Sequence, residues 1–330
     1  MRKHARVLTS LLAVLVLGLT LAACGSSDSG SSGKKSGSGG ASGGASSKLI
    51  KKDPANASKS FTIGSKNFDE QFVLGEIYAQ SLQAAGFKVK KQLNLGSEQI
   101  AFKALKSGQI DAYPEYLGTA LTSFYRVKSA DISDDKTKGY AQLVAKLKGD
   151  GLTALPPTPF QNTFVVTSSK ATAKKYGNPT TLTELGKKAG SSASISGFPE
   201  CKQRTDCLLG MKTVYHWTPK FVSSSGQYDD LERGQADFTF GFGTDGQQRL
   251  NKYATYADDK KLFPPYYITL MMKSTTRQQL GAGGLKVIEA VQKPLTVRVM
   301  QELNSRVSLD KQEPAKVAKD YLTSFGFLKK

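Results

Sequence analysis

A seven-residue segment that occurs twice constrains this chain more than any other feature. Leu105–Asp111 (LKSGQID) returns 126 residues later as Leu231–Asp237 (LERGQAD), and both copies run on into aromatic residues. Each copy predicts a helix ended by glycine and then a short strand. The simplest interpretation is two lobes that each present one aromatic segment, and the alternative is coincidence between two ordinary helix-turn-strand units.

The aromatic segment after the first copy is the stronger candidate for a ligand pocket. Asp111–Thr119 (DAYPEYLGT) combines tyrosines with proline and glycine, which suits a pocket better than a core. We expect a strand end that opens into a binding loop. The second segment, Phe238–Gly246 (FTFGFGTDG), would be its counterpart.

Strand and helix patterns alternate along the chain from Phe61 onwards, which is typical of an α/β lobe. The loop Gly64–Phe68 precedes a predicted helix over 70–85. Free N–H groups at that helix start, beside Lys66, would favour an anion such as a carboxylate, although a solvated loop lysine is the alternative. A polar hairpin is expected at 131–138, and a short helix capped by Thr183.

Two proline-stiffened segments, 155–159 and 261–270, are candidates for crossovers between two lobes. One lobe would comprise residues 60–160 and 268–330, and the other residues 161–267. The C-terminal helices, the last opened by Pro314, should pack on the first lobe.

The N-terminus predicts export. Residues 1–23 have a basic start, an apolar run and then Leu-Ala-Ala before Cys24, which resembles the lipobox of bacterial lipoproteins. We expect Cys24 to be lipidated and the cell membrane to be the location, on its extracytoplasmic face. The run is short for a transmembrane helix, which is the alternative. Residues 24–59 begin with a Gly/Ser-rich stretch that predicts a flexible tether.

The formal net charge of +19 falls to +16 when three basic residues of the signal are subtracted. The lysines are dispersed and no RNA-binding motif or basic helix is present, so nucleic acid is not an expected partner. Attraction to anionic headgroups or wall polymers is one physical explanation of the excess. A solvated lysine-rich surface explains the charge equally simply.

Cysteines other than Cys24 form a pair, Cys201 and Cys207, which predicts a disulfide in an oxidising compartment. Its ring would fix the loop that carries Arg204. Two free thiols or a zinc site are the alternatives, and the single histidine outside the signal, His216, argues against zinc.

Aromatic and basic residues from these loops define a candidate ligand site. Ring faces attract a cation that cannot donate hydrogen bonds, and Lys or Arg binds a carboxylate. A small quaternary amine with a carboxylate fits both demands, whereas core packing is the alternative for each ring. The candidates are Tyr116, Phe164, Phe242 and Tyr266 for the ammonium, and Lys66 and Arg204 for the carboxylate.

Six motifs in order resemble the osmoprotectant family of ABC-importer substrate-binding proteins, which bind glycine betaine, choline or carnitine. The motifs are GSKNFDEQ at 64–71, YPEYLGT at 113–119, Asn162-Thr163-Phe164, Pro199-Glu200 with Arg204 and Asp206, Thr244-Asp245-Gly246, and Phe263-Pro264-Pro265-Tyr266. The similarity runs from about Phe61 to the C-terminus.

The resemblance implies a two-lobed α/β periplasmic-binding-protein (type II) fold with two crossover strands as the hinge, which closes over its ligand. It implies that Tyr116 and Tyr266, with the positions of Phe164 and Phe242, form an aromatic box, and that Lys66, Thr119 and Arg204 hold the carboxylate. The family has tyrosine where this chain has Phe164 and Phe242. Phenylalanine keeps the π face and loses the hydroxyl.

These features together favour a monomeric solute receptor that delivers glycine betaine, or alternatively choline or carnitine, to an ABC permease. An enzyme would need a nucleophile with a base, paired carboxylates or a metal set, and no such motif is present. No cofactor or metal is expected. A structural or adhesive lipoprotein is the third possibility, which the basic charge favours.

Overall fold

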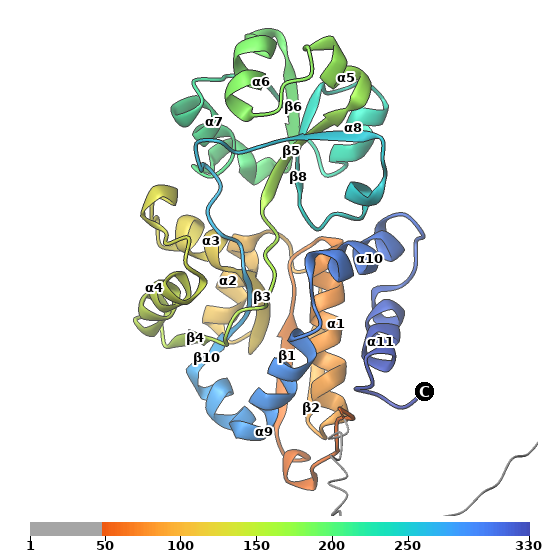
Figure 1. The fold of residues 1–330 in the computed structure, drawn as a ribbon. Coiled ribbons are helices and arrows are strands. Elements are labelled where there is room, and N and C mark those ends of the chain that lie inside the picture. Colours follow the sequence, from red (N-terminus) through yellow and green to blue (C-terminus); the bar gives the residue numbers. More distant parts are fainter. Residues whose placement is uncertain (1–47) are drawn as a thin grey trace, which may run out of the picture. The chain divides into compact units, whose positions relative to one another are not determined.

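The computed structural model describes residues 48–330, and two five-stranded sheets organise them (Figure 1). We call the sheet that begins with β1, together with the helices packed on it, lobe I. Within it β1 pairs in parallel with β2 and β3, whereas β10 is antiparallel to β3 and β4. The strands in spatial order are β2 (Lys88–Gln92), β1 (Ser60–Gly64), β3 (Ala112–Tyr116), β10 (Ile268–Lys273) and β4 (Leu152–Ala154).

The second sheet, which defines lobe II, repeats this plan. Its strand β6 pairs in parallel with β7 and β8, and β5 is antiparallel to β8 and β9. The strands in spatial order are β7 (Lys220–Ser223), β6 (Ser194–Gly197), β8 (Phe238–Phe242), β5 (Phe164–Ser169) and β9 (Tyr253–Tyr256). Each lobe therefore has a parallel half and an antiparallel half, joined at its middle strand.

The repeated segment lies at equivalent places in the two lobes. Helix α2 (Glu98–Ser107) leads through Gly108, at φ 79°, into β3, and α8 (Gln227–Glu232) leads through Gly234, at φ 66°, into β8. Only glycine adopts this left-handed conformation without strain. The predicted order of helix, glycine turn and strand is confirmed in both copies.

The last residue of each copy has the same contact. A carboxylate oxygen of Asp111 accepts the backbone N–H of Thr62 at 2.8 Å, and one of Asp237 accepts that of Ser194 at 2.9 Å. Each aspartate thereby binds the neighbouring parallel strand, Asp111 at the middle of β1 and Asp237 at the start of β6. The repeat therefore marks one structural unit used twice.

Helix α1 (Asp69–Ala84) is the central helix of lobe I, and the C-terminal helices pack against it, as predicted (Figure 1). Its apolar residues, among them Val73, Ile77 and Leu82, are buried in the main core. The C-terminal helices are α9 (Ser274–Gln292), α10 (Val297–Ser308) and α11 (Pro314–Ser324).

Two local predictions in the loops are wrong. Residues 131–138 do not form a hairpin, because the side chain of Asp135 accepts the N–H of Lys138 and so starts α4 (Lys136–Lys148). In lobe II the hydroxyl of Thr181, and not Thr183, caps α6 (Leu182–Ala189) by accepting the N–H of Glu184. The other α-helices of lobe II, besides α8, are α5 (Lys170–Lys175) and α7 (Leu208–Val214).

The expected loop at Tyr116 is also absent. Residues 112–116 are buried in β3, and the chain turns directly into α3 (Leu117–Thr119) and a π-helical turn, Ala120–Phe124. The π-helical turn leads away from the sheet. Tyr116 is therefore held at a rigid strand-to-helix junction.

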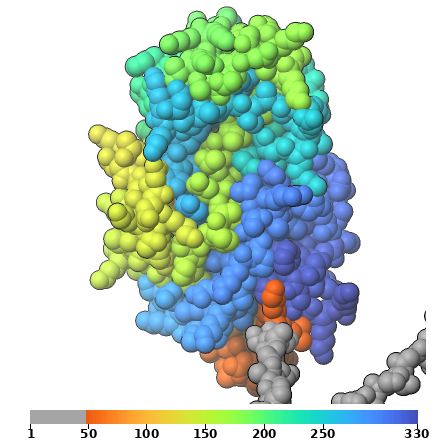
Figure 2. Space-filling model, viewed as in Figure 1, coloured from red at the N-terminus to blue at the C-terminus, as the bar shows by residue number. Residues whose placement is uncertain are grey.

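Two segments, 155–163 and 257–267, connect the lobes and run side by side. The backbone N–H of Asn162 donates to the carbonyl of Tyr266 at 3.1 Å, and Gln161 forms a bridge with Tyr267. Figure 2 shows parts of both segments at the surface, in yellow-green and light blue. The two-lobed α/β class predicted from the sequence is confirmed.

The N-terminal part of the described chain lies against lobe I. The N–H of Ile50 donates to the carbonyl of Phe327 at 3.0 Å, and the buried Asn56 donates to the carbonyl of Ala85 at 3.0 Å. Residues 48–59 thus pack although the sequence places them in the tether. The predicted signal 1–23, the lipidation site Cys24 and the Gly/Ser-rich stretch lie outside the described residues. Within 48–330, no helix has the length and apolarity to span a membrane.

Candidate ligand site between the two sheets

A cavity of about 880 Å³ is lined by residues of both lobes. This volume is in the range of small-molecule sites. The structure brings all seven candidate ligand residues to this one cavity: Lys66, Tyr116, Thr119, Phe164, Arg204, Phe242 and Tyr266. They come from the loop between β1 and α1, from β3 and α3 of lobe I, from β5, β8 and the cysteine loop of lobe II, and from the second connecting segment.

The aromatic side chains form a continuous group. The centroids of Phe164 and Phe242 are 4.9 Å apart, and Tyr266 stands perpendicular to Phe164 at 5.4 Å. Phe68 stacks on both Tyr116 and Phe242, at 6.1 Å in each case. Nine aromatic side chains line the cavity, and we call six of them the ring cluster: Phe68, Tyr116, Phe164, Phe198, Phe242 and Tyr266.

Two members of the ring cluster were not among the candidates. Phe68 follows the first loop and leads into α1, and Phe198 precedes Pro199, where it stacks near-parallel on Phe164 at 6.0 Å. Both lie inside or beside motifs that the sequence had singled out. Their position next to those motifs was the available signal.

Tyr116 is fixed at both ends of its side chain. It is 4% exposed, its ring stacks on Phe68, and its hydroxyl donates to the carboxylate of Glu70 at 2.8 Å. Burial, together with the negative charge of Glu70, raises the pKa of Tyr116 well above its ordinary value. The hydroxyl therefore stays protonated, and the ring face is held toward the cavity.

Lys66 lies in the cavity wall with its charge already paired. Its ammonium forms an ion pair with the fully buried Glu115 and lies 4.4 Å from the centroid of Tyr116. Glu115 also accepts the hydroxyl of Tyr113 at 2.9 Å and the N–H of Tyr116 at 2.7 Å. A ligand carboxylate at Lys66 would have to share this ammonium with Glu115.

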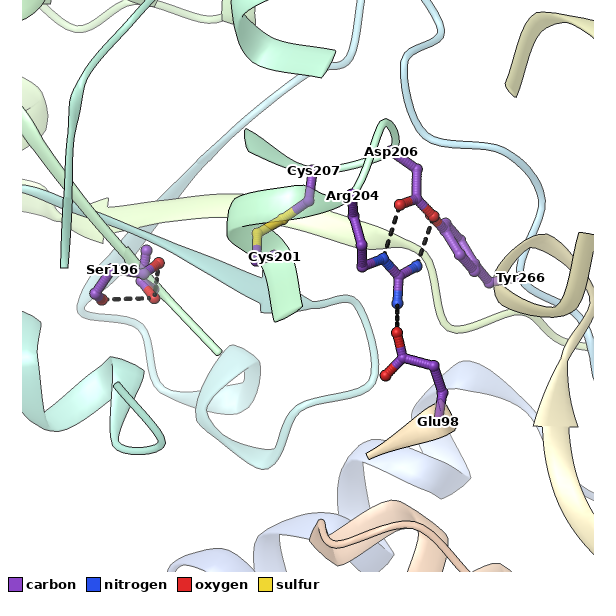
Figure 3. The surroundings of a disulfide bond; sticks show 8 residues. Glu98, Ser196, Cys201, Arg204, Asp206, Cys207 and Tyr266 are labelled. Carbon is purple, nitrogen blue, oxygen red and sulfur yellow. Dashed lines mark hydrogen bonds and ion pairs between the residues drawn. A yellow bond between two sulfur atoms is a disulfide. The ribbon is translucent and has the colours of Figure 1, made fainter. Parts of the chain in front are cut away.

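Arg204 is part of a small ring closed by the disulfide between Cys201 and Cys207, whose Cα atoms are 5.3 Å apart (Figure 3). Both cysteines are buried. The guanidinium binds Asp206 in a bidentate manner, at 2.8 and 2.6 Å, and reaches Glu98 of lobe I at 3.3 Å. Arg204 thus links the two lobes through Glu98.

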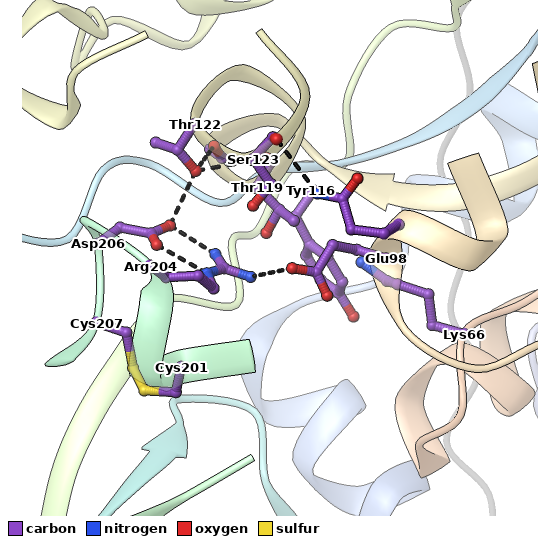
Figure 4. Close-up of polar contacts among 12 residues, drawn as sticks. Lys66, Glu98, Tyr116, Thr119, Thr122, Ser123, Cys201, Arg204, Asp206 and Cys207 are labelled. Carbon is purple, nitrogen blue, oxygen red and sulfur yellow. Dashed lines mark hydrogen bonds and ion pairs between the residues drawn. A yellow bond between two sulfur atoms is a disulfide. The ribbon is translucent and has the colours of Figure 1, made fainter. Parts of the chain in front are cut away.

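Asp206 is the polar centre of this region, and sequence reasoning did not assign it a role. Besides Arg204, it accepts the hydroxyl of Tyr266 at 2.7 Å (Figure 3) and that of Thr122 at 3.1 Å (Figure 4). Burial opposes its ionisation, but Arg204 and these hydroxyls outweigh burial and lower the pKa of Asp206. Asp206 therefore fixes one candidate cation and one candidate ring together.

Thr119 is 5% exposed and ends α3, one turn after Tyr116. Figure 4 shows it beside Tyr116, on the same side of the site as Thr122. Its hydroxyl therefore belongs to the polar part of the cavity wall.

Acidic residues exceed basic ones in the lining. Arg204 and Lys252 have acidic partners, whereas no ion pair to a basic side chain is found within 48–330 for Asp69, Glu70, Glu200 or Asp245. Burial raises the pKa of Asp245 to about 7, against the opposing effect of hydrogen bonds from the N–H of Phe242 and the hydroxyl of Tyr228. The cavity is therefore suited to a positively charged group. The described residues contain no cluster of ligands for a metal ion.

Comparison with known proteins agrees with this arrangement. The model of the family "Substrate binding domain of ABC-type glycine betaine transport system" matches residues 59–324. A glycine-betaine-binding protein of Pseudomonas aeruginosa is 29% identical over 284 residues, covering 82% of this chain and 89% of that protein.

Two further proteins are similar. The ergothioneine transport permease/ergothioneine binding protein EgtU of Helicobacter pylori is 26% identical over 280 residues, which cover 83% of this chain but only 49% of EgtU. The solved structure of a glycine betaine/carnitine/choline ABC transporter protein has 24% identity and a TM-score of 0.65, with 81% of this chain and 99% of that chain covered. The chain therefore belongs to the family of substrate-binding domains of ABC-type glycine betaine transport systems, whose members are extracytoplasmic solute receptors and not enzymes.

Proposed function

We propose that this receptor binds a quaternary-ammonium compatible solute, with glycine betaine first, and delivers it to an ABC permease. The observation that carries the proposal is the ring cluster, because six aromatic side chains from both lobes line one cavity. A trimethylammonium group cannot donate hydrogen bonds, and ring faces are the protein groups that attract it best.

The ammonium would lie among Tyr116, Phe164, Phe242 and Tyr266. Phenylalanine at positions 164 and 242 leaves the π faces available. The two tyrosines donate their hydroxyls to buried carboxylates, Glu70 and Asp206, at 2.8 and 2.7 Å. These bonds place a negative charge at the hydroxyl end of each tyrosine ring and so strengthen the attraction of the ring for a cation.

The ligand carboxylate would face Lys66, Thr119 and Arg204. Of the bonds that Arg204 makes, the one to Glu98 at 3.3 Å is the longest, so a ligand carboxylate would compete most easily with Glu98. Closure of the two lobes would exclude water and strengthen this contact. In this closure one lobe would be residues 60–160 with 268–330 and the other residues 161–267, and the hinge would be the two connecting segments.

Choline, carnitine and ergothioneine are the alternative ligands. The similar solved structure belongs to a transporter of glycine betaine, carnitine and choline, and the relative EgtU is an ergothioneine binding protein. Choline lacks a carboxylate and would therefore use the ring cluster alone. We further propose that the receptor is a monomer, anchored to the membrane through a lipid on Cys24.

Isothermal titration of the purified receptor with glycine betaine, choline, carnitine, ergothioneine and proline tests this function. We expect binding of quaternary amines and none of proline at the same concentration. Lys66→Ala should weaken betaine far more than choline, because only betaine has a carboxylate. Binding of proline without any quaternary amine would refute the proposal, and equal losses of betaine and choline would refute the carboxylate role of Lys66.

A further inference from the structure

Glu70 is a buried carboxylate in the wall of the cavity. It is the second residue of α1 and is 3% exposed. Its oxygens accept hydrogen bonds from the hydroxyls of Tyr116, at 2.8 Å, and Thr244, and from the side-chain amides of Asn162 and Asn304, at 2.9 and 3.0 Å. These donors come from β3, from the first connecting segment, from the loop after β8 and from α10.

The groups around the carboxylate of Glu70 are hydrogen-bond donors. The side-chain oxygen of Asn162 accepts the N–H of Thr244 at 3.3 Å, which orients that amide. The side-chain nitrogen of Asn304 also donates to the carbonyl of Thr244 at 2.8 Å, which orients the second amide. Both amides therefore turn N–H groups toward Glu70. A carboxylate that accepts four donors matches the ionised form, which the N-terminus of α1 also stabilises.

No basic side chain within 48–330 forms an ion pair with Glu70. Of the four basic side chains in the cavity lining, Lys66, Arg204 and Lys252 form ion pairs with other carboxylates, and Lys311 forms no ion pair with Glu70. A buried charge without a counter-charge costs free energy. A cation that enters the cavity beside Tyr116 would recover part of that cost.

We infer that Glu70 is the fixed counter-charge of the bound ammonium and makes the site select for positive charge rather than for the shape of three methyl groups. This inference rests on the proposed function. Glu70 does so from the hydroxyl end of Tyr116, so it is a positioning and specificity residue that need not touch the ligand. Its second effect is electronic, because the tyrosine hydroxyl that donates to it enriches the ring facing the ammonium.

Carbon isosteres separate charge from shape. Choline and 3,3-dimethylbutan-1-ol, and glycine betaine and 3,3-dimethylbutanoate, differ only in the exchange of the ammonium nitrogen for carbon. Affinities would be measured by titration calorimetry, with displacement for the weaker isostere. Wild type should prefer each ammonium to its isostere.

Glu70→Gln should lower the affinity for choline and betaine by about tenfold or more, as expected for a unit charge some 7 Å away in a partly buried site. The affinity of the neutral 3,3-dimethylbutan-1-ol should stay within about twofold, and that of the anionic 3,3-dimethylbutanoate should not fall, because neither carries the positive charge that Glu70 attracts. Addition of Asn304→Asp to Glu70→Gln returns one negative charge beside position 70, because the side-chain amide of Asn304 lies 3.0 Å from the carboxylate of Glu70, and it should restore the preference for the ammonium.

An equal loss for ammonium and isostere would show a purely structural role and overturn the inference, as would an unchanged affinity for choline and betaine. If circular dichroism shows that Glu70→Gln is unfolded, the double variant is tested in its place. A ratio of ammonium affinity to isostere affinity close to that of wild type then supports the inference, and a lost preference for the ammonium overturns it. Wild type that binds neither choline nor betaine would instead refute the proposed function.

Discussion

Removal of the Asp206 carboxylate should lower the free energy of unfolding of the receptor more than a surface substitution does. In Asp206→Ala the guanidinium of Arg204, whose side chain is 10% exposed, loses both of its shortest bonds. Breaking a buried ion pair on one side costs about 3–5 kcal/mol, because the remaining charge stays buried. The hydroxyl of Tyr266 also loses its acceptor, whereas Thr122 keeps one in the carbonyl of Gly118 at 2.9 Å.

We therefore expect the free energy of unfolding of Asp206→Ala to fall by about 3–5 kcal/mol, since the contributions overlap within one network. Urea unfolding followed by circular dichroism and by the fluorescence of Trp217, the single and buried tryptophan, would measure it. Asp134→Ala is the matched control. Its pair with Lys261 is 71% and 79% exposed and should contribute less than about 1 kcal/mol.

The result that would refute this reasoning is a loss below about 1 kcal/mol in Asp206→Ala, similar to that of the control. It would mean that water reaches Arg204 and that the network does not hold the site. Ligand titration of the surviving fold would then show whether Tyr266 still faces the cavity.

Three further variants test separate parts of the account. Tyr116→Ala should weaken choline and glycine betaine by about 1–2 kcal/mol, because it removes one desolvated ring face, and unchanged calorimetric affinity would exclude Tyr116 from the ammonium site. The double variant Cys201→Ser with Cys207→Ser opens the ring around Arg204. We expect urea unfolding to show about 2 kcal/mol less stability, and the affinity for betaine to be several-fold weaker because the freed side chains must be ordered on binding. An unaltered affinity would show that the disulfide contributes to stability and not to binding. Asp245 has its pKa raised to about 7, so it is protonated below that pH and gains its charge as the pH rises. Affinity for choline should therefore increase between pH 6 and 8, and a pH-independent affinity in wild type, or the same slope in Asp245→Asn, would contradict a role for this carboxylate.

The sequence predicted the architecture of this chain well, because its signals are local. The glycines that end α2 and α8 have the left-handed conformation that their place in the repeat required. Pro314 begins α11, as the preference of proline for the first helical turn predicts. The prediction of Thr183 as a cap was wrong, because Thr181, two residues earlier, accepts the N–H of Glu184.

The pairing of the charges in the site could not be predicted. Lys66 and Glu115 are 49 positions apart, and Glu98 and Arg204 are 106 apart, so their contacts depend on the folded arrangement of both lobes. Considered as single residues, Lys66 and Arg204 suggest an anion site. The structure shows the same two cations bound to carboxylates, with Glu70 as an additional buried negative charge.

A crystal structure of the receptor with glycine betaine tests the central claim most directly. The account predicts the ammonium nitrogen within about 6 Å of the ring centroids of Tyr116, Phe164, Phe242 and Tyr266, with the carboxylate toward Lys66 and Arg204. A nitrogen that lies outside the ring cluster, or a cavity that stays empty at saturating betaine, would contradict it.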